Sequence, residues 1–145
     1  MQLSGHLIAA ISAISFAAPG IAAPGPGQVG EWWNISCKHG GPNNIVTGDI
    51  SGLIHSLRTQ SVIGNVGTPV WITSNSDVKF WYGTTLVTVL NKYLLEGANF
   101  EFRHLADALE AMRNSCCGSY PNCIASSANM RSSNYKNLVI LVSRN

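Results

Sequence analysis

Apolar residues in the first half of the chain recur at the three- and four-residue intervals that place side chains on one helix face. This stripe consists of Ile50, Leu53, Ile54 and Leu57. Thr47 or Asp49 is expected to cap the amino terminus of the helix, because both side chains accept hydrogen bonds from free backbone N–H groups. The pattern predicts a helix over about 48–60.

A second apolar stripe follows position 99 and has the same period. It consists of Phe102, Leu105, Ala106, Leu109 and Met112. Asn99 is a suitable residue for the amino-terminal cap, and the stripe stops near Asn114, just before two adjacent cysteines. We therefore expect a second amphipathic helix between Asn99 and Asn114.

Short β-branched and aromatic runs lie between the two stripes and favour strands. We expect strands at 70–73, 78–82 and 86–90, with a turn at 74–77 and a break at Gly83. These turns have the length of hairpin connections, which favours antiparallel pairing of the strands.

The remaining segments differ strongly in polarity. Residues 91–95 fit a helix or a strand, and 96–99 are expected to turn the chain. Residues 118–133 are rich in Ser, Asn, Gly and Pro, which predicts a loop. The run 138–142 is fully apolar, which predicts a strand at the centre of its sheet.

The order of the expected elements is helix, strands, helix and strand. Each helix has one apolar stripe that must be buried against another layer. We therefore predict an α+β fold, in which an antiparallel β-sheet carries two helices packed on one face.

The chain begins with an uncharged apolar run that ends in small residues, which is typical of a secretory signal peptide. Residues 1–22 are expected to be removed, by cleavage after Ala22 or after Ala17. The Pro- and Gly-rich stretch 23–30 predicts a flexible leader, and 31–145 is expected to be one domain. No second apolar run is long enough to span a membrane, so we expect a secreted protein without a stable membrane anchor.

All four cysteines follow the expected cleavage sites, and an even number in a secreted chain indicates two disulfides. A bond between the adjacent Cys116 and Cys117 would strain the backbone, so Cys37 is expected to pair with one of them and Cys123 with the other. The sequon at Asn34 is a candidate for N-glycosylation.

Charged residues are scattered along the chain. Nine Lys and Arg residues against seven Asp and Glu residues give a net charge of +2 without a basic cluster, which argues against a nucleic-acid partner. The histidines that follow the leader, His39, His55 and His104, lack the spacing of a metal site. We expect no metal and no cofactor.

One arrangement suggests an enzyme. Glu101, Arg103 and His104 could supply a general base, a phosphate contact and a general acid of a small secreted ribonuclease. However, neighbouring residues on a helix point about 100° apart and do not face one another. We therefore expect a protein without catalytic activity and keep the ribonuclease as a remote alternative.

The carboxyl-terminal third contains a sequence of short motifs. An Arg103-His104-Leu105 helix start leads to Cys117-Gly118-Ser119-Tyr120-Pro121, and an apolar strand closes the chain at 138–142. With the opening Asn34–Gly40, this pattern resembles the killer protein 4 family of small secreted toxins, first known from a virus of smut fungi. In that family two residues normally separate the cysteines before the Gly-Ser turn, whereas here the cysteines are adjacent.

The resemblance implies an α/β sandwich, with two antiparallel helices on one side of an antiparallel sheet. It implies the pairs Cys37–Cys116 and Cys117–Cys123. It also implies toxicity to competing cells by block of calcium uptake, without catalysis. A basic side chain near the centre of the family's sequence is implicated in that activity, and Lys79 lies at about the matching position.

Three functional hypotheses follow. The first is a secreted, monomeric, killer-toxin-like protein whose positive face, formed by Lys79, Lys38 and Arg103, meets a foreign cell-surface target such as a calcium channel. The second is a pathogen effector on the same scaffold that binds a host protein or glycan. The third is the ribonuclease.

Overall fold

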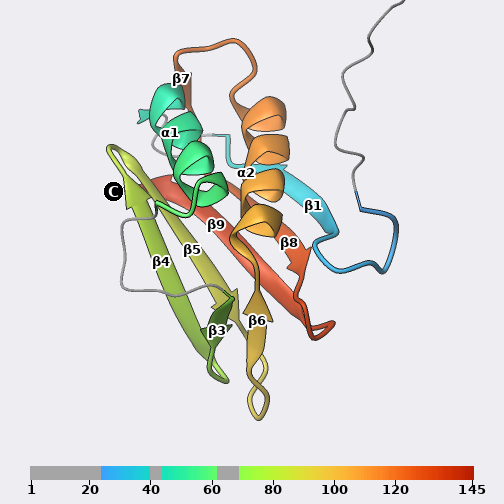
Figure 1. The fold of residues 1–145 in the computed structure, drawn as a ribbon. Helices are drawn as coiled ribbons and strands as arrows, with labels where there is room; N and C mark the ends of the chain where they lie inside the picture. The colour runs from blue at the N-terminus through green and yellow to red at the C-terminus, as the bar shows by residue number, and fades with distance from the viewer. Residues whose placement is uncertain (1–23, 40–43, 62–68) are drawn as a thin grey trace, which may run out of the picture.

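The computed structural model describes residues 24–39, 44–61 and 69–145, so the expected signal peptide lies outside the described residues. The chain forms two layers, with an antiparallel sheet on one side and two helices on the other (Figure 1). The predicted α+β fold is therefore confirmed.

The main sheet has five strands in the order β1-β8-β9-β5-β4, and every neighbouring pair is antiparallel. Its strands are β1 (Trp32–Cys37), β4 (Ser76–Tyr82), β5 (Thr85–Asn91), β8 (Ser126–Arg131) and β9 (Asn137–Arg144). The apolar strand β9 is the middle strand, as the sequence predicts. Two short strand pairs lie outside this sheet, β2 (Ile45–Val46) with β7 (Asn122–Cys123) and β3 (Val70–Ile72) with β6 (Ala98–Phe100).

The helices are α1 (Thr47–Arg58) and α2 (Phe102–Cys116), and both expected apolar stripes are buried. The expected caps are wrong, because no side chain caps either helix and Asn99 lies within β6. Asp49 instead accepts hydrogen bonds from the backbone nitrogen and Oγ1 of Thr84, at 2.7 and 2.8 Å. This carboxylate therefore ties the first turn of α1 to the β4–β5 turn.

The core lies between the helices and the inner face of the sheet. Because side chains alternate along a strand, Val87 and Val89 of β5 point to the helices while Leu86 and Leu90 point away. The Phe80 ring of β4 meets the edge-on rings of Phe100 and Phe102, at centroid distances of 6.3 and 5.9 Å.

The loop predicted over 118–133 is wrong, because this segment holds β7 and the six-residue strand β8. Ser126, Ala128 and Met130 of β8 are buried, and β8 pairs with β1 on one side and β9 on the other. Polar and small residues favour loops locally, but pairing with two strands and burial of every second side chain here outweigh that preference.

Two further predicted boundaries are also wrong. The expected turn 74–77 overlaps the first residues of β4, and the expected turn 96–99 overlaps the start of β6. In both places the strand continues because a partner strand extends along it.

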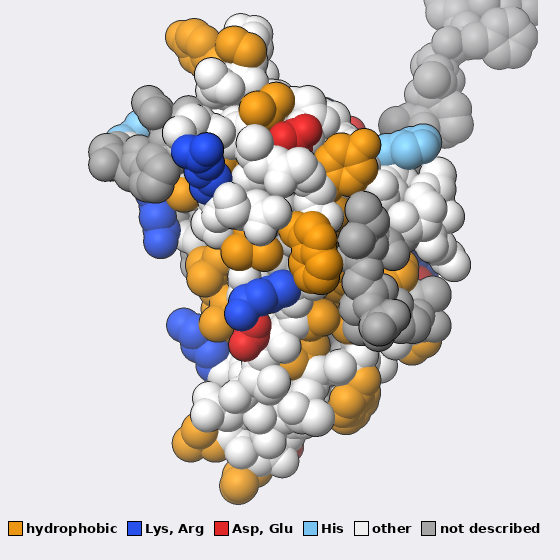
Figure 2. Space-filling view, turned by 90° about the vertical axis from the view of Figure 1, so that its left-hand side faces the viewer, with side chains coloured by type: hydrophobic (Ala, Val, Ile, Leu, Met, Phe, Trp, Pro, Cys, Tyr) orange, Lys and Arg blue, Asp and Glu red, His pale blue; other side chains and the backbone are white. Residues whose placement is uncertain are grey.

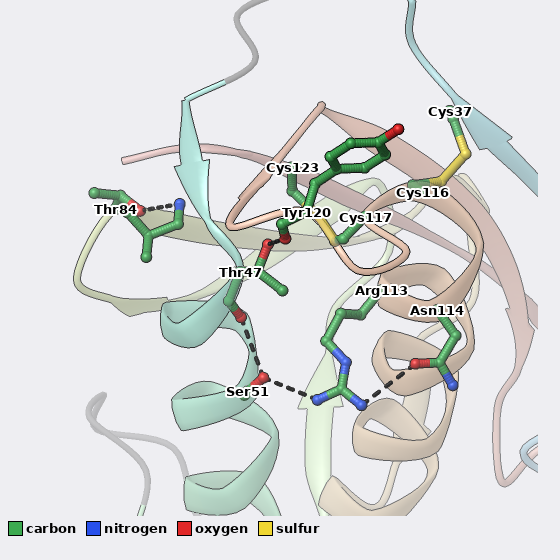
Figure 3. The surroundings of a disulfide bond; sticks show 11 residues. Cys37, Thr47, Ser51, Thr84, Arg113, Asn114, Cys116, Cys117, Tyr120 and Cys123 are labelled. Carbon is green, nitrogen blue, oxygen red and sulfur yellow. Dashed lines mark hydrogen bonds between the residues drawn. A yellow bond between two sulfur atoms is a disulfide. The ribbon is translucent and has the colours of Figure 1, made fainter.

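Two disulfides join the strands to the carboxyl end of α2 (Figure 3). Cys37 at the end of β1 pairs with Cys116, and Cys117 pairs with Cys123 of β7. The prediction of two disulfides is confirmed, and the pairing is the one that the resemblance implies.

Candidate functional site

The outer face of the five-stranded sheet is the side that points away from both helices (Figure 1). Four partly exposed aliphatic side chains lie at its centre: Leu86 and Leu90 of β5, and Val139 and Leu141 of β9. Basic and aromatic side chains surround them on the flanking strands. This mixture is the main candidate for a binding surface.

Lys79 lies on the outer face of β4. Alternation along the strand buries Phe80 and exposes Asp77, Lys79 and Trp81 on the opposite side. The Lys79 ammonium is 3.3 Å from the Asp77 carboxylate, and the Lys79 side chain is 55% exposed. Because an exposed ion pair contributes little to stability, it leaves the ammonium available to another partner.

Trp81 follows on the same face and is 41% exposed. Figure 2 faces the β4 side of the molecule and shows basic, acidic and hydrophobic side chains next to one another. No dense basic block is visible on this side. A partner of this surface would therefore meet a cation beside an aromatic ring.

A cavity of about 270 Å³ lies at one end of the outer face, lined by Lys92, Tyr93, Asn137 and Val139. The Lys136 ammonium lies 5.2 Å from the centre of the Tyr93 ring. Sequence reasoning missed Lys92 because 91–95 fitted either a helix or a strand. The alternation of side chains along β5 could have located it, because Lys92 lies an even number of residues after Leu86 and Leu90 and therefore points to the same outer face.

The structure does not bring Lys79, Lys38 and Arg103 together. Lys38 directly follows β1, the opposite edge strand, which is about 19 Å from β4 across the sheet. Arg103 lies in the first turn of α2, in the other layer, and its Nε is 2.6 Å from Glu101. A single positive face formed by these three residues is therefore not present.

The disulfide-bonded end holds a second cavity, of about 570 Å³, lined in part by His39, Tyr120 and Cys116. Tyr120 is 73% exposed, while its backbone carbonyl accepts a hydrogen bond from Thr47 Oγ1 at 2.8 Å (Figure 3). Arg113 of α2 donates a hydrogen bond to Ser51 of α1 at 2.9 Å. These contacts hold the two helices and the Tyr120 loop in fixed positions.

Asn34, the asparagine of the sequon, is exposed in the edge strand β1. Its φ of 54° lies in the left-handed region, which asparagine tolerates better than most residues. The pairing of β1 with β8 shifts register between Trp33 and Ser36, so Asn34 is part of a β-bulge.

Of the three residues of the ribonuclease hypothesis, Glu101 and Arg103 lie together and line one small cavity, which His104 does not line. Arg103 is paired with Glu101, while the His104 ring packs against Gly30, where an added Cβ would lie 2.6 Å from it. Burial lowers the pKa of His104, and its Nδ1 has no hydrogen-bond partner among the described residues. His39 directly follows β1, and His55 is exposed on α1.

Within residues 24–39, 44–61 and 69–145, no group of three or more His, Cys, Asp or Glu side chains could hold a metal ion. No helix in the described part of the chain is long and apolar enough to cross a membrane. No protein-family model matches the chain, and no curated protein matches it either.

Proposed function

We propose that this protein is secreted and acts without catalysis, as a toxin-like protein that binds foreign cells through the outer face of its sheet. Lys79 is the principal basic contact of that surface, and block of calcium uptake is the mode of action. The resemblance to killer protein 4 toxins suggests this activity, and the exposure of Lys79 supports it.

The exposed ammonium of Lys79 carries the proposal. Its position on a strand fixes the base of the side chain, while the four-carbon stem allows the charge to reach outward. A cationic side chain on a compact protein can occupy the entrance of a cation channel, because its charge replaces that of the permeant ion while the protein blocks passage.

The two disulfides support secretion, because such bonds persist in oxidising compartments. They also support action outside the cell, since a cross-linked small domain resists unfolding there. Lys38 and Arg103 contribute charge elsewhere on the surface and are not part of the proposed contact.

The test is growth inhibition of a sensitive fungus by purified protein, together with calcium uptake by the treated cells. We expect added calcium to relieve inhibition by the native protein. Lys79→Ala should lose at least about tenfold in potency, because a charge-assisted contact contributes about 1.5–3 kcal/mol.

The matched control is Arg144→Ala, which removes one exposed positive charge at the end of β9. Its potency should equal that of the native protein. Equal potency of Lys79→Ala and the native protein would exclude Lys79 as the contact. If the protein leaves fungi and calcium uptake unchanged but binds one host protein, the effector hypothesis replaces this proposal.

A further inference from the structure

The two edges of the five-stranded sheet differ. At the β1 edge, the bulge at Asn34, which is also the asparagine of the sequon, interrupts the regular pairing of the strand. At the β4 edge, seven residues pair with β5 in continuous register, from Ser76 opposite Asn91 to Tyr82 opposite Thr85. Among the described residues, no strand pairs with the other side of β4.

The β4–β5 turn determines which backbone groups of β4 face outward. Gly83 has a φ of 55° and forms a two-residue turn with Thr84, so the closing pair Tyr82–Thr85 exchanges both backbone hydrogen bonds. Because bonded and non-bonded pairs alternate, Val78 and Phe80 also bond to β5. The backbone N–H and C=O groups of Asp77, Lys79 and Trp81 therefore point to the free edge.

The charged side chains on the β4 edge of one copy complement those on the β4 edge of a second copy. Asp77 and Lys79 lie two residues apart on the same face and carry opposite charges. In an antiparallel pair centred on Val78, Lys79 of each copy lies opposite Asp77 of the other. Centring the pair on Lys79 or Asp77 would instead place like charges opposite each other, which is destabilising.

We propose that β4 is a dimer interface, in which two copies pair antiparallel about Val78 and form one continuous sheet of ten strands. In each cross-copy Lys79–Asp77 pair, the two residues then also exchange backbone N–H···O=C hydrogen bonds. This differs from the monomer expected from the sequence, because only the tertiary structure shows that β4 is an edge strand. The inference does not rest on the proposed function, since it concerns the protein alone.

The first test is the molar mass of the purified protein over a range of concentrations, by light scattering and analytical ultracentrifugation. We expect a reversible monomer–dimer equilibrium. Either single substitution, Lys79→Asp or Asp77→Lys, places like charges opposite each other in both cross-copy pairs. Each should therefore raise the dissociation constant of the dimer at least about tenfold. The double variant Asp77→Lys with Lys79→Asp restores both attractions. Its dissociation constant should return to within about threefold of the native value.

The second test is amide hydrogen exchange at low and high protein concentration. The amides of Asp77 and Lys79 should become protected at high concentration, while those of Val78 and Phe80 stay protected at both. A protein that remains monomeric at all concentrations would overturn the proposal. So would a double variant that folds normally but does not recover dimerisation.

These outcomes are separate from the test of function. Asp77→Lys removes the cross-copy pairs but keeps the Lys79 side chain, so comparing its potency with that of Lys79→Ala separates loss of the dimer from loss of Lys79 itself. Failure of the dimer therefore does not decide the fungal assay, and failure of the fungal assay does not decide the dimer.

Discussion

At the residue scale, His104 is the clearest case of a side chain whose chemistry is set by its neighbours. Its ring packs against Gly30, whose φ of 81° and lack of a Cβ permit the close approach. Burial lowers the pKa of His104, and Arg103 acts in the same direction, while Glu101 and Asp107 oppose them. The folded protein therefore favours the neutral imidazole.

This shift predicts a pH dependence of stability. The unfolded chain takes up a proton at His104 near its ordinary pKa of about 6.5, whereas the folded protein does so at lower pH. The stabilisation is thus complete above about pH 6.5 and is lost as the pH falls through the folded pKa. Urea unfolding between pH 8 and 5 should show this loss.

His104→Gln is the control, because glutamine is neutral throughout this range. Its stability should vary less with pH than that of the native protein. An identical pH profile for the two proteins would show that His104 is not responsible. The pKa of Glu110 is also lowered, chiefly by its hydrogen bond from Arg58, but that carboxylate titrates below this range.

At the element scale, β8 shows how pairing partners override local preference. Its sequence is largely polar, yet it lies between two strands and buries every second side chain. Met130 is fully buried on the inner face of the sheet, whereas Asn129 points to the outer face.

This placement predicts a large difference between two adjacent substitutions. Met130→Ala should lower the free energy of unfolding by about 2–5 kcal/mol, because it leaves a cavity in the core. Asn129→Ala should change it by less than about 1 kcal/mol. Urea unfolding measures both values, and a small effect of Met130→Ala would indicate that the segment is a loop.

At the scale of the whole molecule, the two disulfides act on very different lengths of chain. Cys37–Cys116 spans 79 residues and fixes β1 to the end of α2, whereas Cys117–Cys123 spans 6 residues. A cross-link restricts the unfolded chain more when the loop that it closes is longer.

We therefore expect unequal losses when the bridges are removed. Replacing Cys37 and Cys116 by serine should cost about 4 kcal/mol, and replacing Cys117 and Cys123 about 2 kcal/mol. Urea unfolding of the two double variants, each with the other bridge intact, provides the comparison. A larger loss from the short bridge would contradict the unfolded-chain explanation and indicate that local packing dominates.

The sequence by itself determined the features that depend on local period. Both apolar stripes form helices, and the uninterrupted run 138–142 lies within the central strand β9. Four cysteines in an expected secreted chain predicted two disulfides. Lys79 could be placed on a strand, because alternation of side chains along a strand is a local property.

Only the tertiary structure decided the features that depend on partners distant in the sequence. Backbone groups must find partners across the sheet, so the strand β8 and the edge position of β4 follow from non-local pairing. The same pairing separates Lys79, Lys38 and Arg103 and brings Lys92 to the outer face. Local sequence sets which face a side chain takes, but the order of strands decides which side chains share a surface.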